Sequence, residues 1–462
     1  MAAPGFSIKA AAMLLGPILA FLAGSALISA GHSFEAGFTL GVTVLCVVWW
    51  VFEPIPIPAT SLLPLALFPL FGVLPQSAVS QAYGNNLILL LLGGFILSTA
   101  MERSGAHRRI ALNMVRAFGG RSSRGLVFGF MAAAAVLSMW ISNTATTLML
   151  LPVAMAIIDK SPDPKLATPL LLGIAYAASL GGIGTPIGTP PNVIFMGIYE
   201  TTTGNTVAFS TWMTWAVPIV IVFLPLMAFW LTRNLDYRGQ FEMPETGPWR
   251  PEEKRVLIVF SITALAWITR TEPFGGWEGL LGLPYSNDAI VALIAVVAMF
   301  IVPNGTGGRL LDWESAERIP WGMLILFGGG IAIASAFEAS GLSVSIGEAL
   351  SGLANWYPLL LMLMICFAVT FLTEATSNTA TTSLLMPILA ATAIGAAIDP
   401  RLMMVPAAMS ASCAFMLPVA TAPNVIMFST GRFAITTMMR EGLALNLLGV
   451  LLIATFCYVL IA

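Results

Sequence analysis

Charged residues are scarce in this chain of 462 residues, which contains 20 Lys and Arg and 22 Asp and Glu. They make up 9% of the sequence, whereas a soluble domain has about 25%. Apolar residues make up 58%. Because a membrane-spanning helix needs about 20 mostly apolar residues, the composition excludes two soluble domains and indicates an integral membrane protein with room for roughly ten to thirteen membrane segments.

Cysteine and histidine are also rare. The four cysteines lie inside apolar runs without close pairing, which argues against a disulfide framework or a metal site and favours a packing role. They are Cys46, Cys366, Cys413 and Cys457. With only two histidines, His32 and His107, zinc chemistry is not expected. The net charge of −2 and the absence of a basic tract exclude a nucleic-acid partner.

Eleven apolar runs are interpreted as single crossings. They lie near residues 10–31, 36–52, 57–74, 86–101, 166–198, 211–232, 256–269, 288–303, 321–337, 402–430 and 441–462. The first follows Lys9 and is also compatible with a cleavable signal peptide, but the topology favours a retained first span.

Two further runs, 125–158 and 357–398, are too long for one crossing and carry the polar cluster Ser-Asn-Thr near their centres. Irregular backbone at membrane depth must be buried in protein or face a water-filled cavity. Each run is therefore predicted to form a re-entrant hairpin. The expected fold is an all-α polytopic membrane protein with eleven transmembrane helices and two re-entrant helical hairpins in an inverted repeat.

The distribution of basic residues predicts the orientation. With the N-terminus cytoplasmic and the C-terminus outside, every Lys and Arg except Arg270 and Arg401 lies on the inner side, as the positive-inside rule requires. Five crossings separate the hairpins, so they are expected to enter from opposite faces. The short N-terminus is compatible with a bacterial inner membrane.

Three motifs occur twice in the same order. SNTATT occurs at 142–147 and 377–382, LLGGFI at 91–96 corresponds to LFGGGI at 326–331, and GTPPNVI at 188–194 corresponds to ATAPNVI at 420–426. The offsets are 235, 235 and 232 residues. Inverted repeats with interrupted helices are typical of secondary transporters, whose sites lie near the midplane between the repeats.

The hairpin tips can serve two kinds of ion. Ser and Asn are favoured N-caps, and the first N–H groups of the returning helix form an anion site. The arm that ends at the tip contributes free carbonyl groups, which suit a hard cation such as Na⁺. No Lys or Arg lies near either tip in the sequence. An anion would then depend on bound cations, which predicts coupled transport.

The GTPPNVI motif is expected to interrupt a helix at Gly188. Thr189 can be an N-cap, Pro190 suits the first helical position, and Asn192 follows. In the second copy these parts belong to Thr421, Ala422, Pro423 and Asn424.

Glu374 is the one carboxylate within the second hairpin, and its counterpart in the first is Met139. Two interpretations remain open: Glu374 binds a cation or proton, or it neutralises a neighbouring donor or dipole, as intramembrane carboxylates commonly do. Glu102 and Glu338, just past the glycine motifs, are expected at interfaces.

At these residues, and at SCAFMLPVAT (412–421), the whole chain resembles the divalent anion/sodium symporter family. The resemblance implies a homodimer in lipid whose transport domain moves like an elevator against a scaffold domain. It assigns 1–121 and 255–356 to the scaffold and 122–233 and 357–462 to transport, with 234–254 as a cytoplasmic linker.

The resemblance also implies two or more coupling Na⁺ ions and a site for a dicarboxylate anion. The Na⁺ residues would be Ser138, Ser142, Asn143 and the Gly188 carbonyl in one site, and Thr373, Ser377, Asn378 and the Ala420 carbonyl in the other. The substrate residues would be Asn143, Thr144, Thr189, Pro190, Asn378, Thr379, Thr421 and Ala422.

Two positions depart from the pattern of succinate-type members, because Thr189 stands where Ser is common and Ala422 where Pro is common. Ala422 restores a backbone N–H at a helix start. We expect this donor, or the extra space, to alter substrate preference.

The leading hypothesis is a sodium-coupled importer of C4 dicarboxylates such as succinate, malate or fumarate, and not an enzyme. An exchanger of the same family that does not use sodium is the nearest alternative. An intramembrane hydrolase would need a nucleophile beside a base, for which Glu374 is the one candidate. An ion channel would reveal itself by currents that exceed carrier turnover.

Overall fold

The computed structural model describes residues 8–462 except 120–121, 240, 242–246, 350–351 and 353–356. Within this part the fold is all-helical, and the one β-type contact is an isolated bridge between Pro303 and Arg309. Seven of the described helices are long and apolar enough to cross a membrane, and four apolar helices are shorter. The predicted all-α membrane fold is confirmed, whereas the count of eleven crossings stays a prediction.

In the described part of the chain, ten helices precede the first interruption, which lies between Gly182 and Pro190. They are α1 (Ile8–Ser29), α2 (Phe34–Phe52), α3 (Ile57–Thr60), α4 (Leu63–Leu70), α5 (Gln76–Tyr83), α6 (Asn86–Ser104), α7 (Ala106–Gly119), α8 (Ser123–Ser138), α9 (Asn143–Lys160) and α10 (Ala167–Gly182).

The chain continues through the second copy of the motifs. The elements are α11 (Pro190–Thr203), α12 (Phe209–Thr232), α13 (Pro251–Ile268), α14 (Gly276–Leu281), α15 (Asp288–Ile301), α16 (Trp313–Ala316), α17 (Trp321–Ala339), α18 (Leu342–Ala349), α19 (Pro358–Ala375), α20 (Asn378–Gly395), α21 (Pro400–Ser410), η2 (Pro418–Ala420), α22 (Ala422–Phe428) and α23 (Ile435–Ile461).

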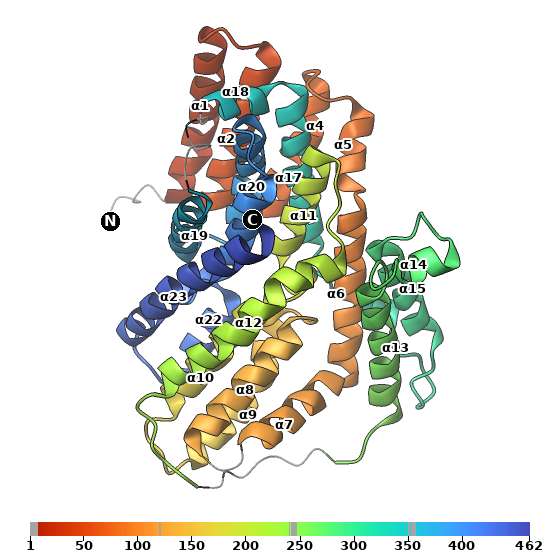
Figure 1. Ribbon diagram of the computed structural model, residues 1–462, viewed down its shortest axis with the longest axis vertical. Helices are drawn as coiled ribbons and strands as arrows, with labels where there is room; N and C mark the ends of the chain where they lie inside the picture. The colour runs from red at the N-terminus through yellow and green to blue at the C-terminus, as the bar shows by residue number, and fades with distance from the viewer. Residues whose placement is uncertain (1–7, 120–121, 240, 242–246, 350–351, 353–356) are drawn as a thin grey trace, which may run out of the picture.

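Two helical hairpins form where the Ser-Asn-Thr clusters interrupt the long apolar runs. The first joins α8 to α9 through residues 139–142, and the second joins α19 to α20 through residues 376–377. In Figure 1 the first hairpin lies in the lower half of the molecule and the second in the upper half. Both returning helices begin at the Asn of the motif, Asn143 and Asn378, as the N-cap pattern predicted.

Helix contacts repeat the sequence duplication in space. Helix α8 packs on α10 and α12, and in the second copy α19 packs on α21 and α23. Between the copies, α20 packs on α11 just as α9 packs on α22. Each hairpin therefore contacts the interrupted helix of its own copy and that of the other copy, which brings both tips to one region (Figure 1).

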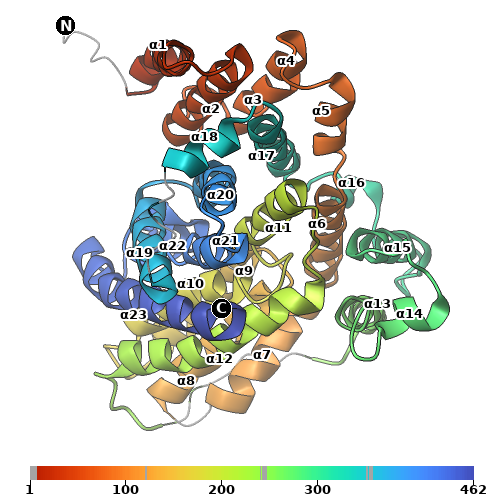
Figure 2. The same cartoon turned by 45° about the horizontal axis from the view of Figure 1, so that its top comes forward.

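The run near 57–74 is interrupted, because α3 ends at Thr60 and α4 starts at Leu63. The indole of Trp50 donates to Ser61 Oγ at 3.0 Å, and the Tyr83 hydroxyl donates to the Ser61 carbonyl. Side chains from α2 and α5 thus satisfy polar groups that the interruption exposes, which is what buried backbone requires. Helices α13 to α15 form a lobe at one side of the molecule (Figure 2).

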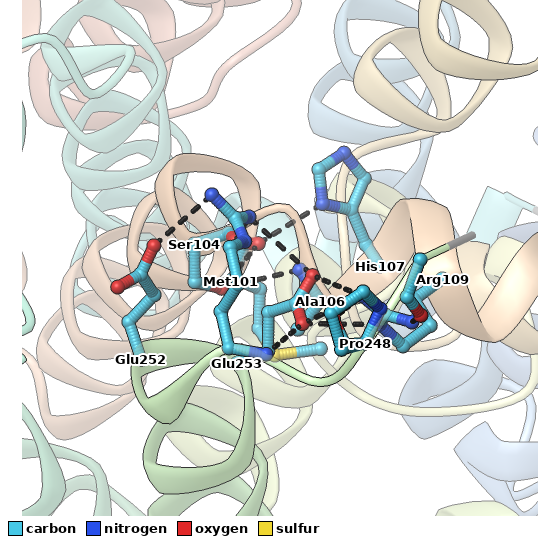
Figure 3. A network of polar contacts seen from close by, with 10 residues as sticks. Met101, Ser104, Ala106, His107, Arg109, Pro248, Glu252 and Glu253 are labelled. Carbon is cyan, nitrogen blue, oxygen red and sulfur yellow. Dashed lines mark hydrogen bonds and ion pairs between the residues drawn. The ribbon is translucent and has the colours of Figure 1, made fainter.

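A polar network holds the corner between α6 and α7 against the segment that leads into α13 (Figure 3). The buried Arg109 pairs with the buried Glu253, with Arg109 Nε 3.0 Å from Glu253 Oε2. The Arg109 guanidinium also donates to the Pro248 carbonyl at 2.8 Å and lies 4.7 Å from the Trp249 ring centre. His107 Nδ1 lies 2.9 Å from the Met101 carbonyl oxygen. These contacts fix the direction in which α7 leaves α6.

Candidate functional site

The first hairpin tip is built by local capping. The Ser142 hydroxyl accepts a hydrogen bond from Ala145 N at 3.1 Å, which caps α9. The Thr185 hydroxyl, from the first interrupted helix, donates to the Met139 carbonyl. The tip is therefore stabilised by a capping bond to its own returning helix and by a hydrogen bond from the interrupted helix of the same copy.

Both interruptions are held by the asparagine of their Pro-Asn pair. Asn192 Nδ2 donates to the carbonyl oxygens of Gly182 at 3.0 Å and Thr185 at 2.7 Å. Asn424 Nδ2 makes the equivalent bonds to the Ala414 and Leu417 carbonyls, both at 3.0 Å. These acceptors are related by the same offset of 232 residues as the motifs. Both asparagines are fully buried.

Neither Asn192 nor Asn424 was among the predicted site residues, although both belong to the recurring motifs. The signal that could have found them is the recurrence of Pro-Asn at an interruption. An uncoiled segment leaves backbone carbonyls without helical partners, and a side-chain NH₂ can satisfy two of them.

Oxygen atoms cluster behind the first tip. Ser138 Oγ and Asn143 Oδ1 are buried, and neither has a hydrogen-bond partner among the described residues. A Cβ placed on Gly182 would lie 2.9 Å from Asn143 Oδ1 and 3.2 Å from the Gly188 carbonyl oxygen. A Cβ placed on Gly188 would lie 3.0 Å from the Ser138 carbonyl oxygen. Hydroxyl, amide and carbonyl oxygens form a donor set that fits a hard cation.

The second tip has the pseudo-equivalent arrangement. The Thr373 hydroxyl, at the position of Ser138, lies 2.7 Å from Asn378 Oδ1 and 2.9 Å from the Ala411 carbonyl oxygen. Ser377 stands at the N-cap of α20 without a capping bond from its side chain, and Ala420 ends the short helix η2. Thr373 and Asn378 of the second cluster thus already contact one another, whereas Ser138 Oγ and Asn143 Oδ1 of the first have no hydrogen-bond partner among the described residues.

Glu374 is held by three donors. Its Oε1 accepts from Met416 N at 2.8 Å and from Asn446 Nδ2 at 2.7 Å, and its Oε2 accepts from Leu417 N at 2.9 Å. Its side chain is 5% exposed. Of the two interpretations of this carboxylate, the contacts favour the structural one, in which it satisfies donors of the second interruption.

The two tips and the two interruptions line one cavity of about 500 Å³. All eight predicted substrate residues lie in its wall: Asn143, Thr144, Thr189, Pro190, Asn378, Thr379, Thr421 and Ala422. Of the predicted Na⁺ residues, Ser142, Asn143, Gly188, Ser377, Asn378 and Ala420 also line it, while Ser138 and Thr373 are fully buried behind the tips.

Four helices begin at this cavity. First-turn residues of α9, α11, α20 and α22 are in its wall, so four helix N-termini converge on it. Thr421 caps α22 by accepting from Asn424 N at 3.3 Å, whereas the Thr189 side chain makes no capping bond. The N-terminal ends of these helices carry partial positive charge and favour an anion without a basic side chain, although α11 contributes less because its first two residues are prolines without an N–H.

Another part of the wall comes from α6, from the segment that leads into α17 and from the first turn of α17, and the sequence did not place it in the site. It contributes Phe95, Ser98, Thr99, Glu102, Arg318 and Met323. The expectation that no basic residue lies near the tips is true along the chain but wrong in space, because folding brings Arg318 to the same cavity. Glu102, which was expected at an interface, lines the cavity.

A family model described as citrate transporter matches residues 47–405. The chain belongs to the citrate transporter family. It is 40% identical over 476 aligned residues to the sodium-dependent dicarboxylate transporter SdcS of Staphylococcus saprophyticus, covering 97% of this chain and 91% of that protein. A relative of the same name from Staphylococcus aureus is 38% identical over 96% of this chain and 90% of its own.

These matches confirm the resemblance to divalent anion/sodium symporters and place the chain among membrane transporters, not enzymes. Two solved structures share the fold. The YdaH transporter of Alcanivorax borkumensis has a TM-score of 0.58 at 18% identity, covering 84% of this chain and 88% of its own. MtrF of Neisseria gonorrhoeae has a TM-score of 0.57 at 13% identity, covering 92% and 94%.

Proposed function

We propose that the protein is a sodium-coupled symporter that imports C4 dicarboxylates such as succinate, malate and fumarate. The observation that carries this proposal is the convergence of four helix N-termini on one cavity, with an oxygen cluster immediately behind each hairpin tip. The two staphylococcal relatives, both described as sodium-dependent dicarboxylate transporters, support the same function.

The two asparagines at the tips offer a physical basis for coupling. An Asn side chain has an oxygen that can bind a cation and an NH₂ that can donate to a carboxylate. With Na⁺ on Oδ1 of Asn143 and Asn378, each amide would be fixed with its NH₂ available to the substrate. Na⁺ binding would thus prepare the anion site, and the Na⁺ gradient would drive uptake.

The predicted Na⁺ sites follow the two oxygen clusters. Ser138, Ser142, Asn143 and the Gly188 carbonyl would hold one ion, and Thr373, Ser377, Asn378 and the Ala420 carbonyl the other. The predicted substrate residues remain Asn143, Thr144, Thr189, Pro190, Asn378, Thr379, Thr421 and Ala422. The substrate carboxylates would accept from N–H groups and hydroxyls of these residues, except for Pro190, which has no donor and would only line the site. The positive ends of these helices favour an anionic substrate.

We further propose an elevator motion of residues 122–233 and 357–462 against a scaffold of 1–121 and 255–356. The cavity wall supports this division, because one side consists of the tips and interruptions and the other of α6 and the start of α17. A homodimer that contacts through the scaffold and an N-terminus in the bacterial cytoplasm complete the proposal.

Citrate is the second candidate substrate, because the family model carries that description. A cavity of about 500 Å³ is large enough for either anion, so size does not discriminate between them. Ala422, whose backbone N–H lies at the start of α22, is the residue at which we expect substrate preference to be set.

Uptake of labelled succinate into proteoliposomes tests the proposal. An inward Na⁺ gradient should drive accumulation, and replacement of Na⁺ by K⁺ or choline should abolish it. Undiminished exchange without Na⁺ would favour the sodium-independent exchanger instead. Competition by unlabelled citrate, malate and sulfate would define the substrate class, and an unchanged order of competitors in Ala422→Pro would contradict the role of that residue.

A further inference from the structure

The part of the cavity wall that comes from α6 and the segment before α17 carries two charges of opposite sign. Glu102 lies near the end of α6 and accepts a hydrogen bond from Ser98 Oγ at 3.2 Å. Arg318 lies just before α17, and its Nη2 donates to Glu314 Oε1 at 2.7 Å. The side chains of Arg318 and Glu314 are 70% and 76% exposed. Arg318 is the one basic side chain among the described residues that line the cavity.

Arg318 has no equivalent arginine in the other copy of the sequence repeat. In an inverted repeat, the mouth that opens on the opposite face is expected to be lined by the counterparts of these residues. At the offset of 235 residues, the position equivalent to Glu102 is Phe337, and Glu338 follows it directly. The segment equivalent to the surroundings of Arg318, residues 80–90, contains no charged residue, and Tyr83 stands at an offset of 235. The segment equivalent to the surroundings of Arg318 therefore provides no arginine.

We propose that Arg318 is a binding residue that attracts the anionic substrate at one face of the membrane only. Arg318 belongs to the proposed scaffold, which stays in place while the transport domain moves. It therefore acts when the cavity is open as in this structure and has no effect after the hairpins have moved. The positive-inside distribution assigns this mouth to the cytoplasm. This inference rests on the proposed function.

The charge of Arg318 changes the rates at which the substrate enters the cavity from water and leaves it again. A charge at the mouth of a low-dielectric cleft raises the local concentration of the opposite ion and its association rate. Attraction to the mouth also favours departure from the tips toward the cytoplasm. The pair with Glu314 weakens this effect, because the carboxylate offsets part of the arginine charge.

Sided transport assays test the inference. Right-side-out vesicles report the external KM for succinate, and inside-out vesicles report the cytoplasmic KM. We expect Arg318→Gln to raise the cytoplasmic KM roughly three- to tenfold at low salt while leaving the external KM unchanged. Glu314→Gln should lower the cytoplasmic KM. Arg309→Gln, which removes an exposed cation outside the cavity wall, is the matched control and should change neither.

Salt dependence separates electrostatic capture from a structural role. Screening at about 1 M ionic strength shortens the range of the charge to about 3 Å, so the Arg318→Gln protein and the wild type should converge there. Equal KM changes at both faces, or a difference that persists at high salt, would overturn the inference. Absence of Na⁺-dependent uptake by the wild type would instead refute the proposed function, so the two failures are distinguishable.

Discussion

Replacing Glu374 by Gln distinguishes the two roles open to this carboxylate. In the structure its oxygens accept from Met416 N, Leu417 N and Asn446 Nδ2 at 2.8, 2.9 and 2.7 Å. Gln keeps the shape but offers one oxygen and one NH₂. The oxygen can still serve Met416 and Asn446, while the NH₂ would face the N–H of Leu417, so two donors would oppose each other.

The magnitude follows from these contacts. Hydrogen bonds to a charged group contribute about 1.5–3 kcal/mol each, and an unsatisfied buried donor costs about 1–3 kcal/mol. Removal of the buried charge offsets part of this loss, because the carboxylate no longer has to be desolvated. We expect a net destabilisation of about 2–4 kcal/mol. Transport capacity should fall because the second interruption loses a fixed shape.

The four buried cysteines provide the assay. All are free, so a thiol-reactive dye should label them only as the protein unfolds. The temperature of labelling should fall for Glu374→Gln. Glu102→Gln is the matched control, because that carboxylate accepts a single side-chain bond from Ser98 and faces the cavity. It should unfold at the wild-type temperature.

The dependence of transport on Na⁺ concentration shows whether Glu374 is structural or a cation ligand. If Glu374 is structural, the remaining transport by Glu374→Gln should keep the wild-type Hill coefficient for Na⁺. A variant that unfolds at the wild-type temperature and has lost one coupled Na⁺ would refute this reasoning and establish Glu374 as a cation ligand.

Four further substitutions test the site and the contacts that support it. Asn192→Ala and Asn424→Ala each remove two buried hydrogen bonds and should lower stability by about 2–3 kcal/mol in the dye assay; wild-type stability of either would contradict the role of the Pro-Asn pair. Ser138→Ala should raise the Na⁺ concentration for half-maximal uptake about tenfold, whereas an unchanged value would exclude that hydroxyl from the first Na⁺ site. Arg109→Gln removes the buried pair with Glu253, which keeps Arg250 as a second partner, and should destabilise the protein by about 2–3 kcal/mol; an unchanged unfolding temperature would show that the network of Figure 3 is not needed to hold α7.

The sequence alone predicted the hairpin tips and the interrupted helices well, because their signals are short-range. A Ser before an Asn caps a helix within three residues, as Ser142 does with Ala145 N. A proline fixes a helix start, as Pro190 does for α11. Recurrence of these signals at nearly one spacing revealed the duplication, which the paired helix contacts reproduce.

Sequence determined the local chemistry, but only the tertiary structure decided which distant groups meet. Arg318 lines the cavity, and Asn446 donates to Glu374 although the two residues are 72 positions apart in the sequence. No periodic pattern in the sequence predicts either contact. The physical reason is the distance along the chain over which each interaction acts. Capping and helix breaking are settled by neighbouring backbone groups, whereas long-range partners depend on how whole helices pack, and many sequences with the same local signals would place other residues there.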